Sequence, residues 1–324
     1  MKENTSKYLD SKDKQILLEL DKNARITYSQ LAKRVKVSKQ VARYRVERLE
    51  KQEYIKGYYS IIDTSLLGYI TFRVYLKWRS ITPKLKKDIL SWLHQQPSIW
   101  AIVNITGKWN LALGISVKNI HQFHEVWESI LTNHLENIDQ YDISIYSPIY
   151  HFTKSYLTGK RDKNPYRILG SKTEIIIDDM DLKILNLLAK NARMSLVNIA
   201  ISLDISAELV SFRKKQLEKK GVIQGYRAMI NVEKLGYHFF KCEIRLLRYK
   251  NIKKILAFCH EHPNIYQVNK VIGGETLEIE FHVLSLNDMI TILEQMEETF
   301  PNTIEKYEYI TILGEEKMVY LPMK

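Results

Sequence analysis

Cysteine is almost absent from this sequence of 324 residues, which holds only Cys242 and Cys259. Their spacing matches no metal site and no disulfide framework, and a chain without disulfides is typical of a reducing compartment. The sequence also lacks an apolar run of the roughly 18 residues that a membrane helix needs. Its first residues are hydrophilic, unlike a signal peptide. We therefore predict a cytoplasmic protein with no membrane partner.

Motifs for catalysis and for cofactor binding are missing as well. The sequence shows neither a glycine-rich phosphate loop nor the spacing of a Ser/His/Asp or Cys/His site. His121 and His124 lie three positions apart beside Glu125, which makes at most half of a metal site, and a solvated helix face is the favoured interpretation. We predict no cofactor, no metal and no catalytic residues.

Positive charge, by contrast, is plentiful. Lysine and arginine number 49 against 37 acidic residues, which gives a formal net charge of +12. Such an excess indicates a polyanionic partner, most often nucleic acid; the alternative is that the charge serves only solubility. The length suits two to four domains, and 45% hydrophobic residues suffice for ordinary cores.

The chain repeats itself. "YIKGYYSIIDTSLLGY" at residues 54–69 returns as "VIQGYRAMINVEKLGY" at 222–237, an offset of 168. About a third of the positions match over some 70 residues at this offset. Each half opens with three amphipathic helical segments, capped in the first half by Asp10, Thr27 and Ser38. A βαββαβ rhythm follows in each half, as in the alternating strand pattern of residues 71–79.

These patterns predict an α+β chain in which two winged helix-turn-helix domains alternate with two ferredoxin-like βαββαβ domains. The predicted boundaries are 8–60 for the first helix-turn-helix, 61–152 for the first βαββαβ domain, 153–176 for a linker, 177–228 for the second helix-turn-helix and 229–324 for the second βαββαβ domain.

The motifs "LDSKDKQILLELDKNARITYSQLAKRVKVS", "RVERLEKQEYIKGYYSIIDTSLLGY" and "ITGKWNLALGI", with their second-half counterparts, resemble the Lrp/AsnC (feast/famine) family of transcriptional regulators. The resemblance covers almost the whole chain, once in each half. It implies a DNA-binding regulator whose βαββαβ domains pair through their sheets, and which binds an amino acid or another small-molecule effector near that interface. The pairing is then either within one chain, as a pseudo-dimer, or between two chains.

The basic third helix of the first half is the predicted DNA reader, because arginine, lysine, glutamine and tyrosine contact phosphates and base edges. Val41, Ala42, Val46 and Leu49 are expected to face inward, and Arg45 to form a structural ion pair or a phosphate contact. The predicted DNA-binding residues are Lys33, Arg34, Lys36, Lys39, Gln40, Arg43, Tyr44 and Arg48, with Lys215 from the second half.

The second helix-turn-helix is predicted to be a weaker reader. Residues 27–57 carry nine basic and three acidic side chains, whereas residues 195–225 carry five and three. Its third helix is expected to bury Leu209, Val210 and Leu217, while Phe212 and Ile201 suit an interface at least as well as a DNA groove. The alternative for the third helix of the first half is a solvated basic face on a core helix.

Two tight turns are the candidate effector-binding segments that the resemblance implies. They comprise Gly107, Lys108, Trp109 and Asn110 in the first half, and Gly273, Gly274 and Glu275 in the second. Only Glu275 offers a carboxylate for an amino group, so an altered ligand, or none, is as good an interpretation as a free amino acid. Hairpins that simply need glycine are the structural alternative.

Two other functions remain open at this point. Siroheme decarboxylases resemble the same plan, but they carry His and Arg near the second strand of the βαββαβ domain, where this chain has only Lys270 as a match in charge. A ligand-sensing or scaffolding protein without DNA binding is the third interpretation.

Overall fold

Each half of the chain begins with a three-helix unit. The computed structural model describes residues 9–160, 166–170, 174–319 and 321. The first half opens with α1 (Ser11–Lys22), α2 (Tyr28–Val35) and α3 (Lys39–Lys51). The second opens with α6 (Asp179–Lys190), α7 (Leu196–Leu203) and α8 (Ala207–Lys219). The side chains of Asp10, Thr27 and Ser38 accept the main-chain hydrogen bonds that start the first three helices, as predicted.

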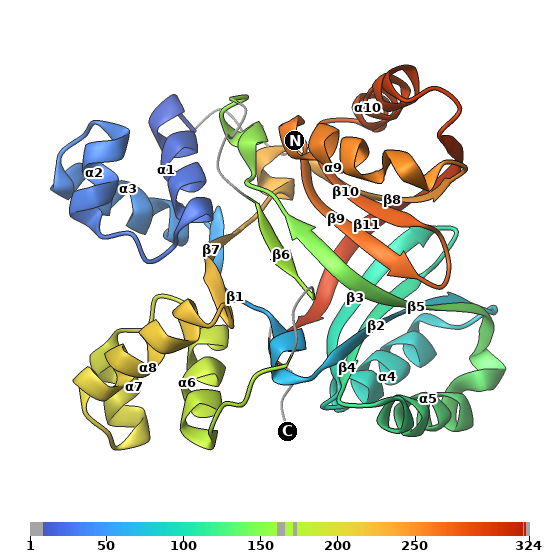
Figure 1. The fold of residues 1–324 in the computed structure, drawn as a ribbon, viewed down its shortest axis with the longest axis horizontal. Coiled ribbons are helices and arrows are strands. Elements are labelled where there is room, and N and C mark those ends of the chain that lie inside the picture. The colour runs from blue at the N-terminus through green and yellow to red at the C-terminus, as the bar shows by residue number, and fades with distance from the viewer. Residues whose placement is uncertain (1–8, 161–165, 171–173, 320, 322–324) are drawn as a thin grey trace.

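The strands that follow the two helical units pair with each other. Strand β1 (Ile55–Ile62) lies antiparallel to β7 (Ile223–Ile230), and the ribbon separates the two helix-turn-helix units on one side of the molecule (Figure 1). The main-chain amide of Ala24 donates to the carbonyl of Tyr226 at 2.9 Å, and that of Ala192 donates to the carbonyl of Tyr58 at 3.0 Å. Each Gly-Tyr motif therefore holds the Lys-Asn-Ala-Arg turn of the opposite half.

The second part of each half has the predicted βαββαβ order. In the first half it comprises β2 (Ile70–Trp78), α4 (Pro83–His94), β3 (Ile99–Gly107), β4 (Leu111–Val117), α5 (Ile120–His134) and β5 (Ile138–His151). In the second half it comprises β8 (His238–Leu246), α9 (Ile252–Glu261), β9 (Ile265–Ile272), β10 (Leu277–Val283), α10 (Leu286–Thr299) and β11 (Ile304–Met318). The α+β architecture with ferredoxin-like domains is confirmed.

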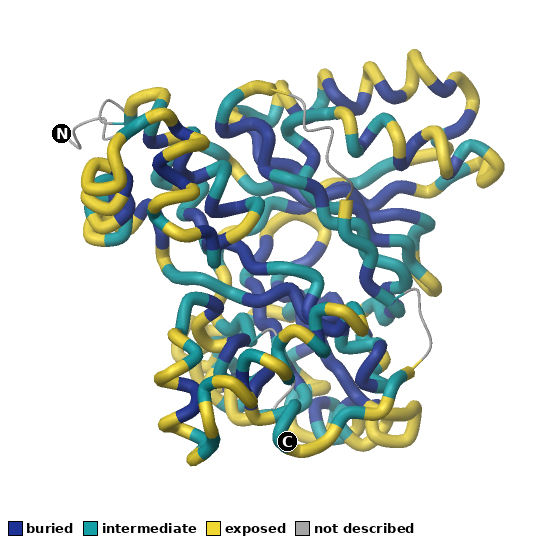
Figure 2. Tube along the Cα trace, turned by 60° about the vertical axis from the view of Figure 1, so that its left-hand side comes forward, coloured by how far each residue is buried: buried dark blue, intermediate teal, exposed yellow. Residues whose placement is uncertain are grey.

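The two sheets join along both edges. Strand β3 pairs with β11, β5 pairs with β9, and the β2–β5 pairing completes the first sheet, so the strands close into a ring. Helices α4 and α5 cover the outside of one sheet, and α9 and α10 cover the outside of the other (Figure 1). The inner faces of the two sheets therefore meet each other, and Figure 2 shows that the strands between the exposed helices are largely buried.

Described parts of the segment predicted as a linker pack against the domains. Tyr156 and Leu157 lie buried in the core of the first helix-turn-helix, and β6 (Arg167–Leu169) pairs with the end of β5. Residues 161–165 and 171–173 of the predicted linker lie outside the described residues. The described part of the segment therefore fastens the first helix-turn-helix to the sheets. Within the described ranges, no helix has the length and apolar character of a membrane span.

Candidate nucleic-acid interface

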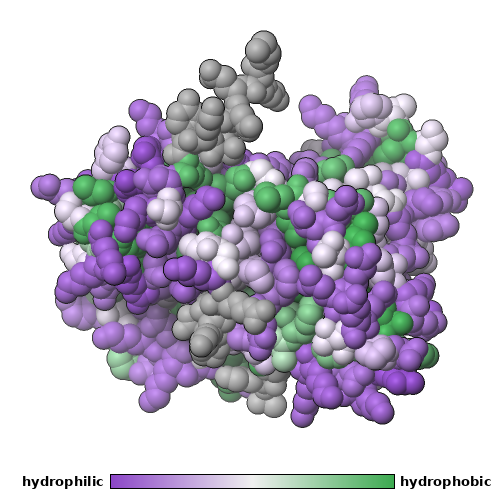
Figure 3. Space-filling view, turned by 90° about the horizontal axis from the view of Figure 1, so that it is seen from above, coloured by the Kyte–Doolittle hydropathy of each residue, from purple (hydrophilic) through white to green (hydrophobic). Residues whose placement is uncertain are grey.

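Helix α3 presents a polar face to solvent. Ala42, Val46 and Leu49 bury its inner side against α1 and α2. The side chains of Lys39, Gln40, Arg43 and Tyr44 are exposed, as predicted for the reader. Val41 was expected inside, but it is 40% exposed, whereas its neighbour Ala42 is completely buried. The surface over the first helix-turn-helix is largely hydrophilic (Figure 3).

Arg43 forms an exposed ion pair within α3. Its Nε lies 2.7 Å from the Glu47 carboxylate one turn along, and the two side chains are 66% and 51% exposed. An exposed pair of this kind contributes little to stability, so another anion can replace Glu47 at small cost.

Arg45 and Arg48 point away from solvent toward α1. Arg45 lies 2.7 Å from Asp10 and 2.9 Å from the buried Asp13, which is the structural ion pair that we expected. Arg48 was predicted to contact DNA, but it is half-buried and its Nη2 lies 2.5 Å from Asp13. The buried carboxylate of Asp13 attracts both guanidinium groups, so this face of α3 is a clamp within the domain rather than a free basic surface.

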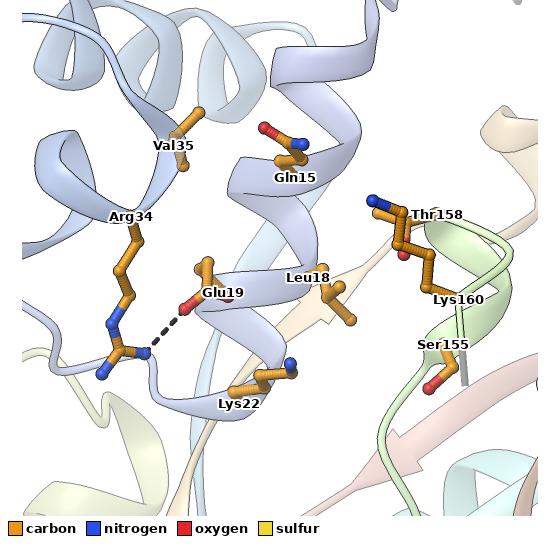
Figure 4. Close-up of a pocket in the computed structure, with 9 residues that line it drawn as sticks. All are labelled: Gln15, Leu18, Glu19, Lys22, Arg34, Val35, Ser155, Thr158 and Lys160. Carbon is orange, nitrogen blue, oxygen red and sulfur yellow. Dashed lines mark hydrogen bonds and ion pairs between the residues drawn. The ribbon is translucent and has the colours of Figure 1, made fainter. Parts of the chain in front are cut away.

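The other predicted basic residues lie on α2 and at its end. Lys33 and Lys36 are exposed, and Lys36 ends α2 in the left-handed region with φ 58°. Arg34 pairs with Glu19 of α1 at 2.7 Å, beside a cleft of about 280 Å³ between α1 and the segment after β5 (Figure 4). Arg34 keeps 56% of its side chain exposed and remains available at the surface.

The second helix-turn-helix repeats the Arg45 part of the clamp but has Gln216 in place of Arg48, and it does not repeat the polar face. Arg213 lies 2.6 Å from Asp178 and 3.0 Å from Asp181, as Arg45 does from Asp10 and Asp13. At the exposed positions of α8, Phe212 is 60% exposed, and Lys215 is also exposed. Leu209 was expected inside but is 37% exposed, and Ile201 on α7 is 75% exposed.

The candidate effector turn of the first half is occupied by contacts within the chain. Lys108 Nζ lies 2.5 Å from Glu308 and 3.7 Å from Glu243, both in the second half. Trp109 is buried between the sheets and stacks beside Tyr75 at a centroid distance of 5.9 Å. The turn therefore acts as a contact between the two βαββαβ domains.

The remaining turn residues have similar internal roles. The side chain of Asn110 accepts a hydrogen bond from the main chain of Trp78. Gly107 has φ 121°, and a Cβ there would lie 3.0 Å from a main-chain oxygen. In the second half, Glu275 lies 2.8 Å from Arg245 and 3.1 Å from Lys306. Gly273 and Gly274 have positive φ values of 84° and 66°, so this hairpin requires glycine.

A network of charged side chains between the two sheets was not predicted. Lys241 Nζ lies 2.7 Å from Glu280 and 3.1 Å from Glu278, and all three side chains are almost completely buried. Tyr75 from the first half donates to Glu278 at 3.1 Å, and Tyr146 donates to the same carboxylate. Burial and the nearby Arg73 oppose a charge on Lys241, but the two carboxylates raise its pKa above the ordinary value. Tyrosines of one half thus satisfy carboxylates of the other.

A second carboxylate row crosses the same interior. Glu243 on β8 lies directly opposite Glu278 on β10 and opposite Glu308 on β11. Burial, and then the neighbouring Glu278, raise the pKa of Glu243 to about 7. The signal was visible in the sequence, since "LEIEFHV" puts acidic residues on alternate positions of a strand, but alternation alone assigns them to solvent.

Comparisons with known proteins agree with this geometry. A family of winged helix-turn-helix DNA-binding domains matches residues 9–56 and again residues 177–224. The uncharacterized HTH-type transcriptional regulator PF1734 of Pyrococcus furiosus is 48% identical over 113 residues, 35% of this chain and 76% of that protein. The uncharacterized HTH-type transcriptional regulator YezC of Bacillus subtilis is 35% identical over 97 residues, 30% of this chain and 68% of that protein.

A solved structure matches the arrangement of the whole chain. The siroheme decarboxylase NirDL aligns with 96% of this chain and 94% of its own at a TM-score of 0.63 and 15% sequence identity. At this identity the likeness is one of fold alone.

Proposed function

Because the chain belongs to the Lrp/AsnC family of DNA-binding transcriptional regulators, we propose that its two halves form one DNA-binding pair in which the first half reads the sequence. The observation that carries this proposal is the contrast between the exposed faces of α3 and α8. At the offset of 168, the exposed Lys39, Gln40, Arg43 and Tyr44 correspond to Ala207, Glu208, Ser211 and Phe212.

These differences leave α8 with fewer side chains that can contact base edges and with less positive charge than α3. Arginine and glutamine make bidentate contacts with base edges, and lysine neutralises phosphates. Alanine, serine and phenylalanine supply none of these contacts, and Glu208 repels the DNA backbone. The ion pairs of Arg45, repeated by Arg213, and the Gly-Tyr contacts are retained in both halves, although Gln216 stands at the position of Arg48. The second unit therefore keeps its shape while its DNA-facing chemistry is reduced.

Mobility shifts on a genomic DNA fragment selected by the protein test this asymmetry. Arg43→Ala and Lys39→Ala should each weaken binding by about 10- to 100-fold, the range expected for a lost contact of 1–3 kcal/mol. Lys215→Ala, on the exposed face of α8, is the matched control and should change binding by less than about threefold. Equal losses in the two halves would refute the assignment of the first half as the principal reader.

We further propose that the βαββαβ domains pair within one chain as a pseudo-dimer. Their inner faces differ in a complementary way. Lys241 and Glu280 lie in register in the second half, where the first half has Arg73 and Gly114 in register. Two second halves from different chains would face each other with carboxylates and without the tyrosines that donate to Glu278. The buried charges therefore favour pairing of a first half with a second half.

For the two candidate effector turns we propose a structural role. Lys108 and Glu275 already hold partners of opposite charge, and Trp109 fills the space between the sheets. A free amino acid would have to break these ion pairs to reach the charged groups of either turn. Contacts between the two domains thus stand where the family resemblance implies an amino-acid effector.

Enzyme activity is the weaker alternative. The relatives at 35% and 48% identity carry the names of transcriptional regulators, whereas the likeness to siroheme decarboxylase is one of fold. Lys270, the one match in charge on the second strand, lies over the ring of Tyr249 at 5.4 Å. The chain is accordingly a regulator rather than a decarboxylase.

A further inference from the structure

A polar cleft of about 550 Å³ lies between the two helix-turn-helix units. The described residues that line it are Arg25, Ile26, Thr27, Tyr28, Ser29 and Lys39 from the first half, and Arg193 from the second. None of these lining residues is acidic. The cleft therefore combines positive charge from both halves with hydroxyl groups at the start of α2, a composition that suits an oxyanion.

The two arginines of the cleft are held in place by contacts between the two halves. Arg193 is the last residue of the turn in which the amide of Ala192 donates to the carbonyl of Tyr58. Its guanidinium lies 5.1 Å from the ring centre of Tyr28 and 5.0 Å from that of Tyr58. Arg25 donates to the carbonyl oxygens of Ala192 and Met194 at 2.6 Å and 3.0 Å. Across the described parts of the chain, no carboxylate lies within ion-pair distance of Arg25, Lys39 or Arg193. Arg193 reaches Glu50 through the hydroxyl of Tyr58, to which it donates at 3.5 Å. Within the described chain the three cations therefore lack a direct acidic partner.

The repeat allows a comparison with the corresponding surface of the second half. At the offset of 168, Tyr28, Ser29 and Lys39 correspond to Leu196, Val197 and Ala207. The second half thus replaces two hydroxyl groups and one cation by apolar side chains. A general need for contact between the two units does not explain this difference in side chains, whereas a ligand on the side of the first half does.

The position of the cleft indicates which ligand it binds. Lys39 is the first residue of α3, so the cleft continues the proposed reading face. We propose that the cleft binds a backbone phosphate of the DNA that lies between the two helix-turn-helix units, and that Arg193 is the contribution of the second half to DNA affinity. This inference rests on the proposed function, but it concerns a residue outside both third helices.

Two substitutions test the cleft in the full-length chain. Arg193→Gln removes the charge, and Ser29→Asp adds a carboxylate at an exposed position near the start of α2, where an acidic residue favours the helix. The matched control is Ser80→Asp, at an exposed serine beyond the end of β2. Since Arg193 also contacts two tyrosines, Ser29→Asp keeps the test valid if Arg193→Gln fails to fold.

The readout is DNA affinity as a function of salt, on the selected genomic fragment and on unrelated DNA. Both substitutions should weaken binding roughly tenfold or more on both DNAs, and Arg193→Gln should lower the salt slope by about one. Ser80→Asp should bind as wild type does. If Arg43→Ala weakens binding while Arg193→Gln and Ser29→Asp leave it unchanged, the cleft proposal is wrong and the reader assignment stands.

A free phosphate compound is the competing source of the same chemistry. Inorganic pyrophosphate is therefore titrated against the protein without DNA, and the melting temperature is recorded. We expect wild type and Ser29→Asp to respond alike. Stabilisation of wild type alone, combined with equal DNA affinity of the two proteins, would assign the cleft to a small phosphate ligand and overturn the proposal.

Discussion

The buried lysine between the sheets offers a sharp test of how the two halves are held together. In Lys241→Met the apolar chain fills most of the space of the lysine, but Glu280 and Glu278 lose a cation at 2.7 Å and 3.1 Å. Removing one partner of a buried ion pair costs about 3–5 kcal/mol, because the remaining charge stays buried without compensation. This is a large part of the 5–15 kcal/mol that stabilises a typical folded domain.

The matched control is Lys306→Met at the rim of the same sheet. Lys306 is 43% exposed and pairs with Glu275 at 3.1 Å, and Glu275 keeps Arg245 at 2.8 Å. Its loss should cost at most about 1 kcal/mol. Urea unfolding followed by tryptophan fluorescence measures both variants, because Trp109 lies buried between the two sheets.

The pH dependence separates charge from packing in this experiment. Burial alone would raise the pKa of Glu280, and Lys241 holds it below its ordinary value. Without Lys241 the buried Glu280 carboxylate takes up a proton more readily in the folded state, so the variant should lose stability relative to wild type as the pH rises from about 5 to 8. A deficit no larger than that of Lys306→Met, or one independent of pH, would refute the role given to the network.

Two further outcomes are expected. The pKa of Glu243 is raised to about 7 in the folded chain, so between about pH 4.5 and 7 the folded protein keeps a proton that the unfolded chain releases. The stability of the wild type therefore falls as the pH rises through this window. Glu243→Gln should be more stable than wild type by up to about 3 kcal/mol at pH 8 and equal to it near pH 4.5; a difference of the same size at both pH values would speak against this. Since Lys108 and Glu275 hold internal partners, none of the twenty amino acids should raise the melting temperature in differential scanning fluorimetry; a rise of several degrees that Lys108→Met abolishes would restore the turns as an effector site.

Local patterns in the sequence were enough to predict the elements and their order. Caps such as Asp10 and Ser38, the helical spacing of buried residues and the alternation in the strands all depend on neighbours within a few positions. The repeat then predicted the same elements for the second half. Single positions at the edge of a helical stripe, such as Val41 and Leu209, went wrong because exposure there depends on how neighbouring helices meet.

The contacts between the halves could not be derived in this way. Glu278 and Glu280 alternate with apolar residues and therefore look solvent-facing, but the opposing layer comes from residues more than 100 positions away. Arg48 looked like a DNA contact because its partner Asp13 lies 35 residues earlier on another helix. The meaning of the repeated Gly-Tyr motif was hidden for the same reason: its carbonyl oxygen holds a turn of the opposite half.

Methylation-interference footprinting on the selected genomic fragment tests directly whether the two helix-turn-helix units contact DNA unequally. One bound chain should place its two units on adjacent stretches of the same DNA. We expect strong guanine interference on the stretch contacted by the first unit, and weak interference, mainly from backbone contacts, on the other. Two equal and symmetric footprints would contradict it.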